Sequence, residues 1–268
     1  MNTRITITRI FFAFALIAIC KAFYMHLLPH QLLSPVLVNP MADNTYWLMY
    51  FLGIPQFILN NQSVALLFGL LLFTIPVLGF IYPSRVVFAR IFSVLFFLFF
   101  LISNAFHGHG WVAILISSLL FCTKKQNNFI LLFNAIRYYV AFVFISAALW
   151  KLLRGGVFID GIMVEILKLQ HLTSLIEDPS SFYSSFILHL IEHPLVSQGV
   201  LLFVIVLQLT FIIAFSTKKY DFFLFALFFL FFLGDWIVMG ISFFEFYAFG
   251  IFLYPWKSLE VEYGKLKY

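Results

Sequence analysis

The chain has 268 residues and a formal net charge of +5, with 63% apolar and only 10% charged residues. A soluble domain carries about 25% charged residues, so this chain has too few charges to cover a water-exposed surface of its own. Composition therefore excludes an ordinary soluble enzyme. We expect the excess positive charge to reflect membrane topology and not binding to nucleic acid.

Eight apolar segments follow one another along the chain. They cover residues 10–28, 63–82, 86–106, 110–122, 129–151, 195–216, 221–238 and 241–256. A membrane-spanning helix needs about 20 mostly apolar residues, which most of these segments approach. The sequence therefore predicts one all-α transmembrane domain over residues 1–268, a polytopic bundle of about eight spans. Because the fourth segment is short and the last two are close together, seven spans plus a re-entrant segment is the alternative.

The basic residues orient this bundle. If the N-terminus lies in the cytoplasm, the inner loops hold 11 of the 16 lysines and arginines. These are Arg4, Arg9, Arg85, Arg90, Lys124, Lys125, Lys218, Lys219, Lys257, Lys265 and Lys267. The outer segment 29–62 holds none, as the positive-inside rule requires. We therefore predict a multi-pass protein of the cell membrane, with the lipid bilayer as its partner and both termini cytoplasmic.

Two outer segments are long, residues 29–62 and 152–194. The first contains four prolines, so one short interfacial helix near 45–59 is expected. The second is expected to contain two short helices, because apolar residues recur at helical spacing after residue 159 and prolines bound the region near 179–194.

Three ionisable residues fall at similar middle depths when the helical rise is counted from the inner face: Lys21, Arg137 and Glu245. An ionisable side chain costs at least about 2.5–3.5 kcal/mol at the centre of a bilayer, so each needs a reason to be there. One interpretation is structural, with Glu245 neutralising Arg137 and joining two helices. The other is that the cluster lines a cavity for a polar headgroup or cofactor.

A second polar set maps to the outer end of the bundle. Its members are His107, His109, Lys151, Asp160 and Asp235. Histidine exchanges protons near neutral pH, and a lysine withdrawn from water can act as a base. Together these groups would form a proton-transfer site that opens outward. The alternative is that they are ordinary interfacial residues, with Lys151 extending its ammonium to water.

One motif suggests metal chemistry. His189, Glu192 and His193 match the H-x-x-E-H pattern of a zinc-peptidase family. However, Pro194 ends the helix at once, and no downstream glutamate is well placed to complete a ligand set. We therefore expect no metal site.

The stretch from Arg137 to Gly161 reads as an arginine, a helix of aromatic and aliphatic residues that ends at Lys151, a glycine-containing turn and an Asp-Gly pair. It resembles the membrane core of the vitamin K-dependent γ-carboxylase and its bacterial HTTM relatives. The family motif there is Ala-Gly-x-x-Lys-Leu. The matching positions are Ala147, Ala148, Leu149, Trp150, Lys151 and Leu152. The resemblance covers residues 84–170, about a third of the chain.

The resemblance implies roles for three residues. Lys151 falls on the lysine regarded in the carboxylase as the base that acts on vitamin K hydroquinone. His109 falls where the family has a histidine ahead of a short helix, and Arg137 falls on the family arginine. The chain departs from the pattern at Ala148, which replaces a glycine, and lacks the tryptophan after the lysine. It also ends soon after its last apolar segment, without the large outer domain of the carboxylase, so peptide carboxylation is not expected.

We therefore predict a compact HTTM-like membrane protein that holds a quinone-like or lipid-like ligand in an outward-facing pocket; the sequence does not identify the cofactor, and a quinone or hydroquinone is one option. If the protein is catalytic, Lys151 would be the general base, and His109 would relay protons or bind the oxygen of the ligand. The ligand-binding residues would be Arg137, His107, Asp160, Asp235 and Glu245. A second hypothesis is a non-enzymatic subunit or assembly factor bound to other membrane proteins. A small transporter ranks third, because the sequence has no internal repeat of the kind that many transporters show.

Overall fold

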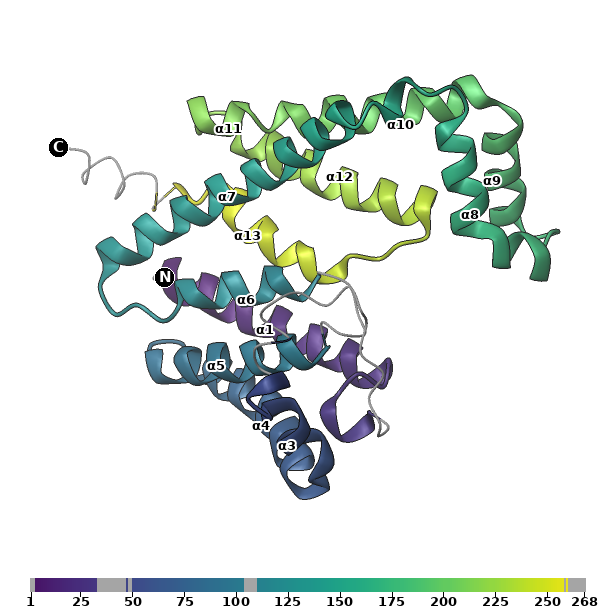
Figure 1. The fold of residues 1–268 in the computed structure, drawn as a ribbon. Helices are drawn as coiled ribbons and strands as arrows, with labels where there is room; N and C mark the ends of the chain where they lie inside the picture. Colours follow the sequence, from purple (N-terminus) through teal and green to yellow (C-terminus); the bar gives the residue numbers. More distant parts are fainter. Residues whose placement is uncertain (1–2, 33–46, 48–49, 104–109, 258, 260–268) are drawn as a thin grey trace. The chain divides into compact units, whose positions relative to one another are not determined.

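The structure is a computed structural model that describes residues 3–32, 47, 50–103, 110–257 and 259 (Figure 1). The regular structure of these described residues is helical throughout. The predicted fold class, an all-α bundle of apolar helices, is therefore confirmed.

Five helical segments are long and apolar enough to cross a membrane. They are α1 (Thr3–Tyr24), α4 (Gln62–Ile81), α7 (Gln126–Leu153), α10 (Pro194–Thr210) with its continuation α11 (Ile213–Ser216), and α12 (Asp221–Met239). The other predicted membrane segments form shorter apolar helices. These are α5 (Val86–Ser103), α6 (Trp111–Leu120), and η3 (Phe244–Phe249) with α13 (Gly250–Leu253). The chain is thus a helical membrane protein, and the count of eight spans stays a prediction.

The segment 152–194 contains the two short helices that were predicted, α8 (Ile162–Glu177) and α9 (Phe182–Glu192), preceded by the 3-10 turn η2 (Gly156–Phe158). Ser181 caps α9, because its side chain accepts a hydrogen bond from the backbone N–H of Ser184. In the segment 29–62 the structure describes η1 (Pro29–Gln31) and α3 (Ile54–Asn60), and α3 covers the end of the predicted interfacial helix. Residues 33–46 of that segment lie outside the described residues.

The chain divides into two compact units. The first comprises residues 1–136, 244–251 and 256–268, and the second comprises residues 137–243 and 252–255. Each unit is described by itself below, and the single transmembrane domain stays a prediction.

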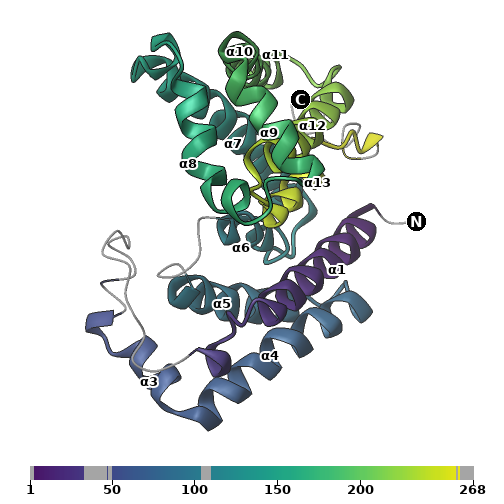
Figure 2. The same ribbon diagram turned by 90° about the vertical axis from the view of Figure 1, so that its right-hand side faces the viewer.

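In the first unit, α1 packs against α4, α4 against α5, α5 against α6, and α6 against η3. Figure 2 shows α1, α4 and α5 side by side. The contact between α1 and α4 depends on Gly79, because a Cβ atom there would lie 2.5 Å from the ring of Phe12. Small residues let membrane helices approach closely in this way. Three phenylalanines of α5, Phe92, Phe96 and Phe99, are buried, and the last two contact the ring of Trp111 in α6.

In the second unit, α10 contacts α8, α9 and α12. The ring of Phe144 in α7 stacks on Phe211 at the end of α10, with 4.2 Å between the ring centroids. It also contacts Phe228 in α12, at a centroid distance of 5.6 Å. Higher on α7, Ala148 shares a buried cluster with Ile205. Since residue numbers rise along α7 while they fall along α10, these two helices run antiparallel.

Candidate functional site

A buried ion pair ties α7 to α12 in the second unit. The guanidinium of Arg137 donates from Nε to Asp221 Oδ2 at 3.0 Å and from Nη2 to Asp221 Oδ1. It also donates to the backbone carbonyls of Ala214 at 2.7 Å and Thr217 at 3.0 Å. Both charged side chains are almost fully buried. A paired, two-pronged contact of this kind is among the strongest polar contacts in proteins, and here it fixes the turn between α11 and α12.

This pair corrects one sequence interpretation. The carboxylate that neutralises Arg137 is Asp221, and not Glu245 as hypothesised. Asp221 is the first residue of α12, a position at which an acid is also favoured by the positive end of the helix. Depth alone could not reveal the pairing, because it does not say which helices are neighbours.

The contacts of α7 with α12 repeat at a constant offset. Arg137 meets Asp221 and Phe144 meets Phe228, and each pair is separated by 84 positions in the chain. The two contacts on each helix are seven residues apart, which is the spacing that keeps two parallel helices in register. One heptad further on, the same register brings Lys151 and Asp235 to the same level.

The polar residues at that level are Lys151, Gln208 and Asp235, which we call the outer polar group after the side on which the basic residues of the sequence predict them to lie. Lys151 Nζ donates to Gln208 Oε1 at 2.9 Å, and Gln208 is buried within α10. Asp235 lies near enough for its charge to interact with that of Lys151. Among the described residues, Gln208 is the one hydrogen-bond partner of the ammonium. Lys151 and Asp235 are both half-buried.

The sequence prediction that Arg137 and Lys151 converge on one hollow is wrong. They are 14 residues apart on the same continuous helix. At 1.5 Å per residue, this separates their Cα atoms by about 21 Å along the helix axis. Arg137 is held by Asp221, while Lys151 belongs to the outer polar group.

Of the remaining predicted site residues, the structure describes Asp160 and Glu245. His107 and His109 lie outside the described residues. Asp160 is exposed in the turn that leads into α8. Glu245 belongs to the first unit, where its Oε1 atom is 2.8 Å from Lys21 Nζ. Its other oxygen lies close to Gly110, where an added Cβ atom would be only 2.9 Å away. Within the expected cluster of three charges, Glu245 therefore pairs with Lys21, a contact that the sequence did not predict.

The H-x-x-E-H motif forms a local contact between its two histidines. Their ring centroids are 4.2 Å apart, and His193 Nδ1 lies 2.8 Å from the backbone carbonyl oxygen of His189. Within the described part of the chain, no three His, Cys, Asp or Glu residues are grouped as metal ligands.

A buried histidine that the sequence did not single out lies where α8, α9 and the end of α12 meet. His171 Nε2 is 2.8 Å from the carbonyl oxygen of Val238, so this nitrogen must carry the proton. Its Nδ1 atom then accepts from the hydroxyl of Tyr183 at 3.4 Å. Burial raises the pKa of Tyr183, which keeps the hydroxyl protonated. This contact joins the two outer helices to α12.

The outer polar group differs chemically from both ion pairs. An ammonium has three donor hydrogens, and a half-buried lysine with a neutral partner keeps donors available for a ligand oxygen. Asp235 can accept a proton or a hydrogen bond beside it.

No protein-family model, curated protein or solved structure matches the chain.

Proposed function

We propose that the protein is an HTTM-like and γ-carboxylase-like membrane protein that binds a quinone-like or lipid-like ligand at the outer polar group. The observation that carries the proposal is the incomplete bonding of Lys151. By contrast, Lys21 and Arg137 also lie in apolar helices, and each is neutralised by a direct ion pair with a carboxylate. An intramembrane charge without such a partner is a functional-site candidate by default.

The arrangement suggests one reaction step. In its neutral form, the amine of Lys151 would take the proton of a hydroquinone O–H, which leaves the electron pair on the ligand oxygen and produces an ammonium. Asp235 would stabilise that ammonium by its charge, and Gln208 would hold the amine in position. Lysines that are partly withdrawn from water can serve as such general bases.

The family resemblance supports the same lysine. Lys151 occupies the position of the proposed base within the Ala147–Leu152 motif, and the heptad register supplies Asp235 beside it. The basic inner loops support a location in the cell membrane with both termini in the cytoplasm.

A second candidate function, a non-enzymatic subunit or assembly factor, is favoured by a different observation. The outer helices expose large apolar side chains, including Leu169 at 78% and Phe182 at 90%. Such residues at the membrane surface would suit contact with another membrane protein. In that case Lys151 would be dispensable.

Ligand retention separates the two functions. The parent protein, Lys151→Met and the matched control Lys168→Met would be purified from native membranes, and their bound lipids and quinones analysed by mass spectrometry. Lys168 is suitable because it is an exposed lysine on α8. We expect the parent and the control to retain the same quinone or lipid, and Lys151→Met to lose at least about nine-tenths of it. Equal retention in all three proteins would reject the ligand site and favour the subunit.

A further inference from the structure

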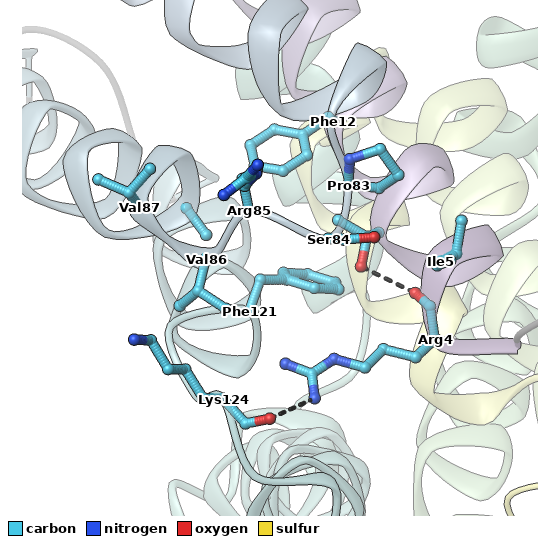
Figure 3. Close-up of a pocket in the computed structure, with 12 residues that line it drawn as sticks. Arg4, Ile5, Phe12, Pro83, Ser84, Arg85, Val86, Val87, Phe121 and Lys124 are labelled. Atoms are coloured by element: carbon cyan, nitrogen blue, oxygen red, sulfur yellow. Dashed lines mark hydrogen bonds between the residues drawn. The ribbon is translucent and has the colours of Figure 1, made fainter.

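The first unit contains a cavity of about 450 Å³ at one end of its helices (Figure 3). The cavity lies at the start of α1, the turn from α4 to α5 and the turn after α6. Successive membrane helices alternate in direction, so these three places belong to the same end of the unit. If these helices cross the bilayer, the cavity lies at a membrane–water interface.

Basic side chains from three separate segments line the cavity. Arg4 comes from α1, Arg85 from the turn before α5, and Lys124 from the turn before α7, as Figure 3 shows. None of the twelve lining residues is acidic. Arg85 and Lys124 are exposed, and among the described residues neither side chain has an ion-pair partner.

Arg4 is fixed in place by the backbone. Its guanidinium donates to the carbonyl oxygen of Lys124 at 3.1 Å and to that of Thr123, and it lies over the ring of Phe129 at 4.8 Å. These carbonyl partners hold the guanidinium in one orientation at the cavity wall. The cavity therefore has one positioned cation and two that are free to move onto a ligand.

The walls add two features that suit a phosphate attached to an apolar body. Val86 and Val87 belong to the first turn of α5, whose backbone N–H groups form the positive end of that helix. Anions bind readily at such helix ends. On another side, Phe12 and Phe121 provide a buried aromatic surface.

We propose that this cavity binds the phosphate group of an anionic phospholipid. Three cations without a lining acid select a negative ligand, and basic pockets between membrane helices are known sites for lipid headgroups. The aromatic wall and the position at the helix ends favour a lipid over a free phosphate ion. The site is separate from the outer polar group and does not depend on the function proposed for it.

The test is native mass spectrometry of the full chain in detergent, titrated with short-chain phosphatidylglycerol, phosphatidylcholine or inorganic phosphate. The variant Arg85→Gln/Lys124→Gln removes the two mobile cations but keeps Arg4, whose carbonyl bonds hold the loop. The matched control Lys125→Gln/Lys219→Gln removes two exposed charges that do not line the cavity. Thermal unfolding of each variant shows that it is folded.

We expect phosphatidylglycerol to bind at least about tenfold more tightly than phosphatidylcholine, and the cavity variant to weaken it by about tenfold or more. The control should bind like the parent. Equal affinity for both lipids, or an equal loss in both double variants, would overturn the proposal. Binding of inorganic phosphate that depends on Arg85 and Lys124, without any preference between lipids, would overturn the lipid as the ligand and identify the free anion.

Discussion

The helix α7 carries two cations, Arg137 and Lys151, which are bonded very differently. Arg137 makes four hydrogen bonds, two of them to a buried carboxylate. Lys151 makes one, to a neutral glutamine. Both face the same two partners, α10–α11 and α12, so their difference arises from local chemistry and not from a different helix. The comparison teaches that a charged side chain in an apolar helix stabilises the fold where the protein supplies all its hydrogen bonds. Where the protein leaves donors unused, the side chain can bond to a ligand.

The physical reason is desolvation. Removing two charges from water costs several kcal/mol per ion, and only an ion pair with good geometry and further hydrogen bonds offsets that cost. Arg137 and Asp221 meet this condition at the inner level. Lys151 and Asp235 are only half-buried, so water or a ligand can supply the hydrogen bonds that the protein does not.

The largest effect is expected at the inner pair. Asp221→Asn leaves the guanidinium of Arg137 buried without its countercharge, which should lower the free energy of unfolding by about 3–5 kcal/mol. Denaturant unfolding in detergent would measure this loss. The double variant Arg137→Leu/Asp221→Leu is the control, and it should recover more than half of the stability because no charge remains buried. An Asp221→Asn protein as stable as the parent would show that the pair is not an anchor.

The pair in the first unit should respond less strongly. Lys21→Met leaves Glu245 unpaired, but the Lys21 side chain is 24% exposed, so we expect a loss of about 2 kcal/mol. Adding Glu245→Gln to the variant should restore part of the loss, since an amide has no charge to desolvate. The same unfolding experiment applies, and a greater loss than for Asp221→Asn would reverse the ranking.

At Lys151 the effect on stability should be smaller still. Lys151→Met removes one hydrogen bond from Gln208 and should cost about 1 kcal/mol in the same unfolding assay. Gln208→Leu serves as the comparison. The double variant Lys151→Met/Gln208→Leu should lose no more unfolding free energy than the two single variants lose together. A loss of 3 kcal/mol or more, on the order of a broken buried pair, would place Lys151 among the structural ions.

The smallest effect is expected on the surface of α8. Lys168 and Glu165 form an ion pair at 2.9 Å, with half or more of each side chain exposed. Lys168→Gln should change the free energy of unfolding by less than about 0.5 kcal/mol. A clear destabilisation here would mean that exposure does not separate weak ion pairs from strong ones in this protein.

The sequence predicted the helices well, because runs of apolar residues determine them without reference to neighbours. It also singled out Lys151 and Asp235 as members of one polar set and placed Lys21 and Glu245 at a similar depth, but it paired Glu245 with Arg137 instead of Lys21. It missed Gln208 and Asp221, since depth along one helix does not show which faces of different helices meet. The spacing of seven residues along α7 and α12 was present in the sequence, but only the two contacts of Arg137 with Asp221 and of Phe144 with Phe228 show that the helices share it.

We propose that Lys151 binds a ligand, whereas Arg137 stabilises the fold. The most direct test is the dissociation constant of a short-tailed quinone, measured by calorimetry for the parent, for Lys151→Met and for the folded Arg137→Leu/Asp221→Leu protein. We predict that Lys151→Met binds at least about tenfold more weakly, while the double variant stays within about threefold of the parent. Unchanged binding by Lys151→Met, or an equal loss in the double variant, would contradict the account.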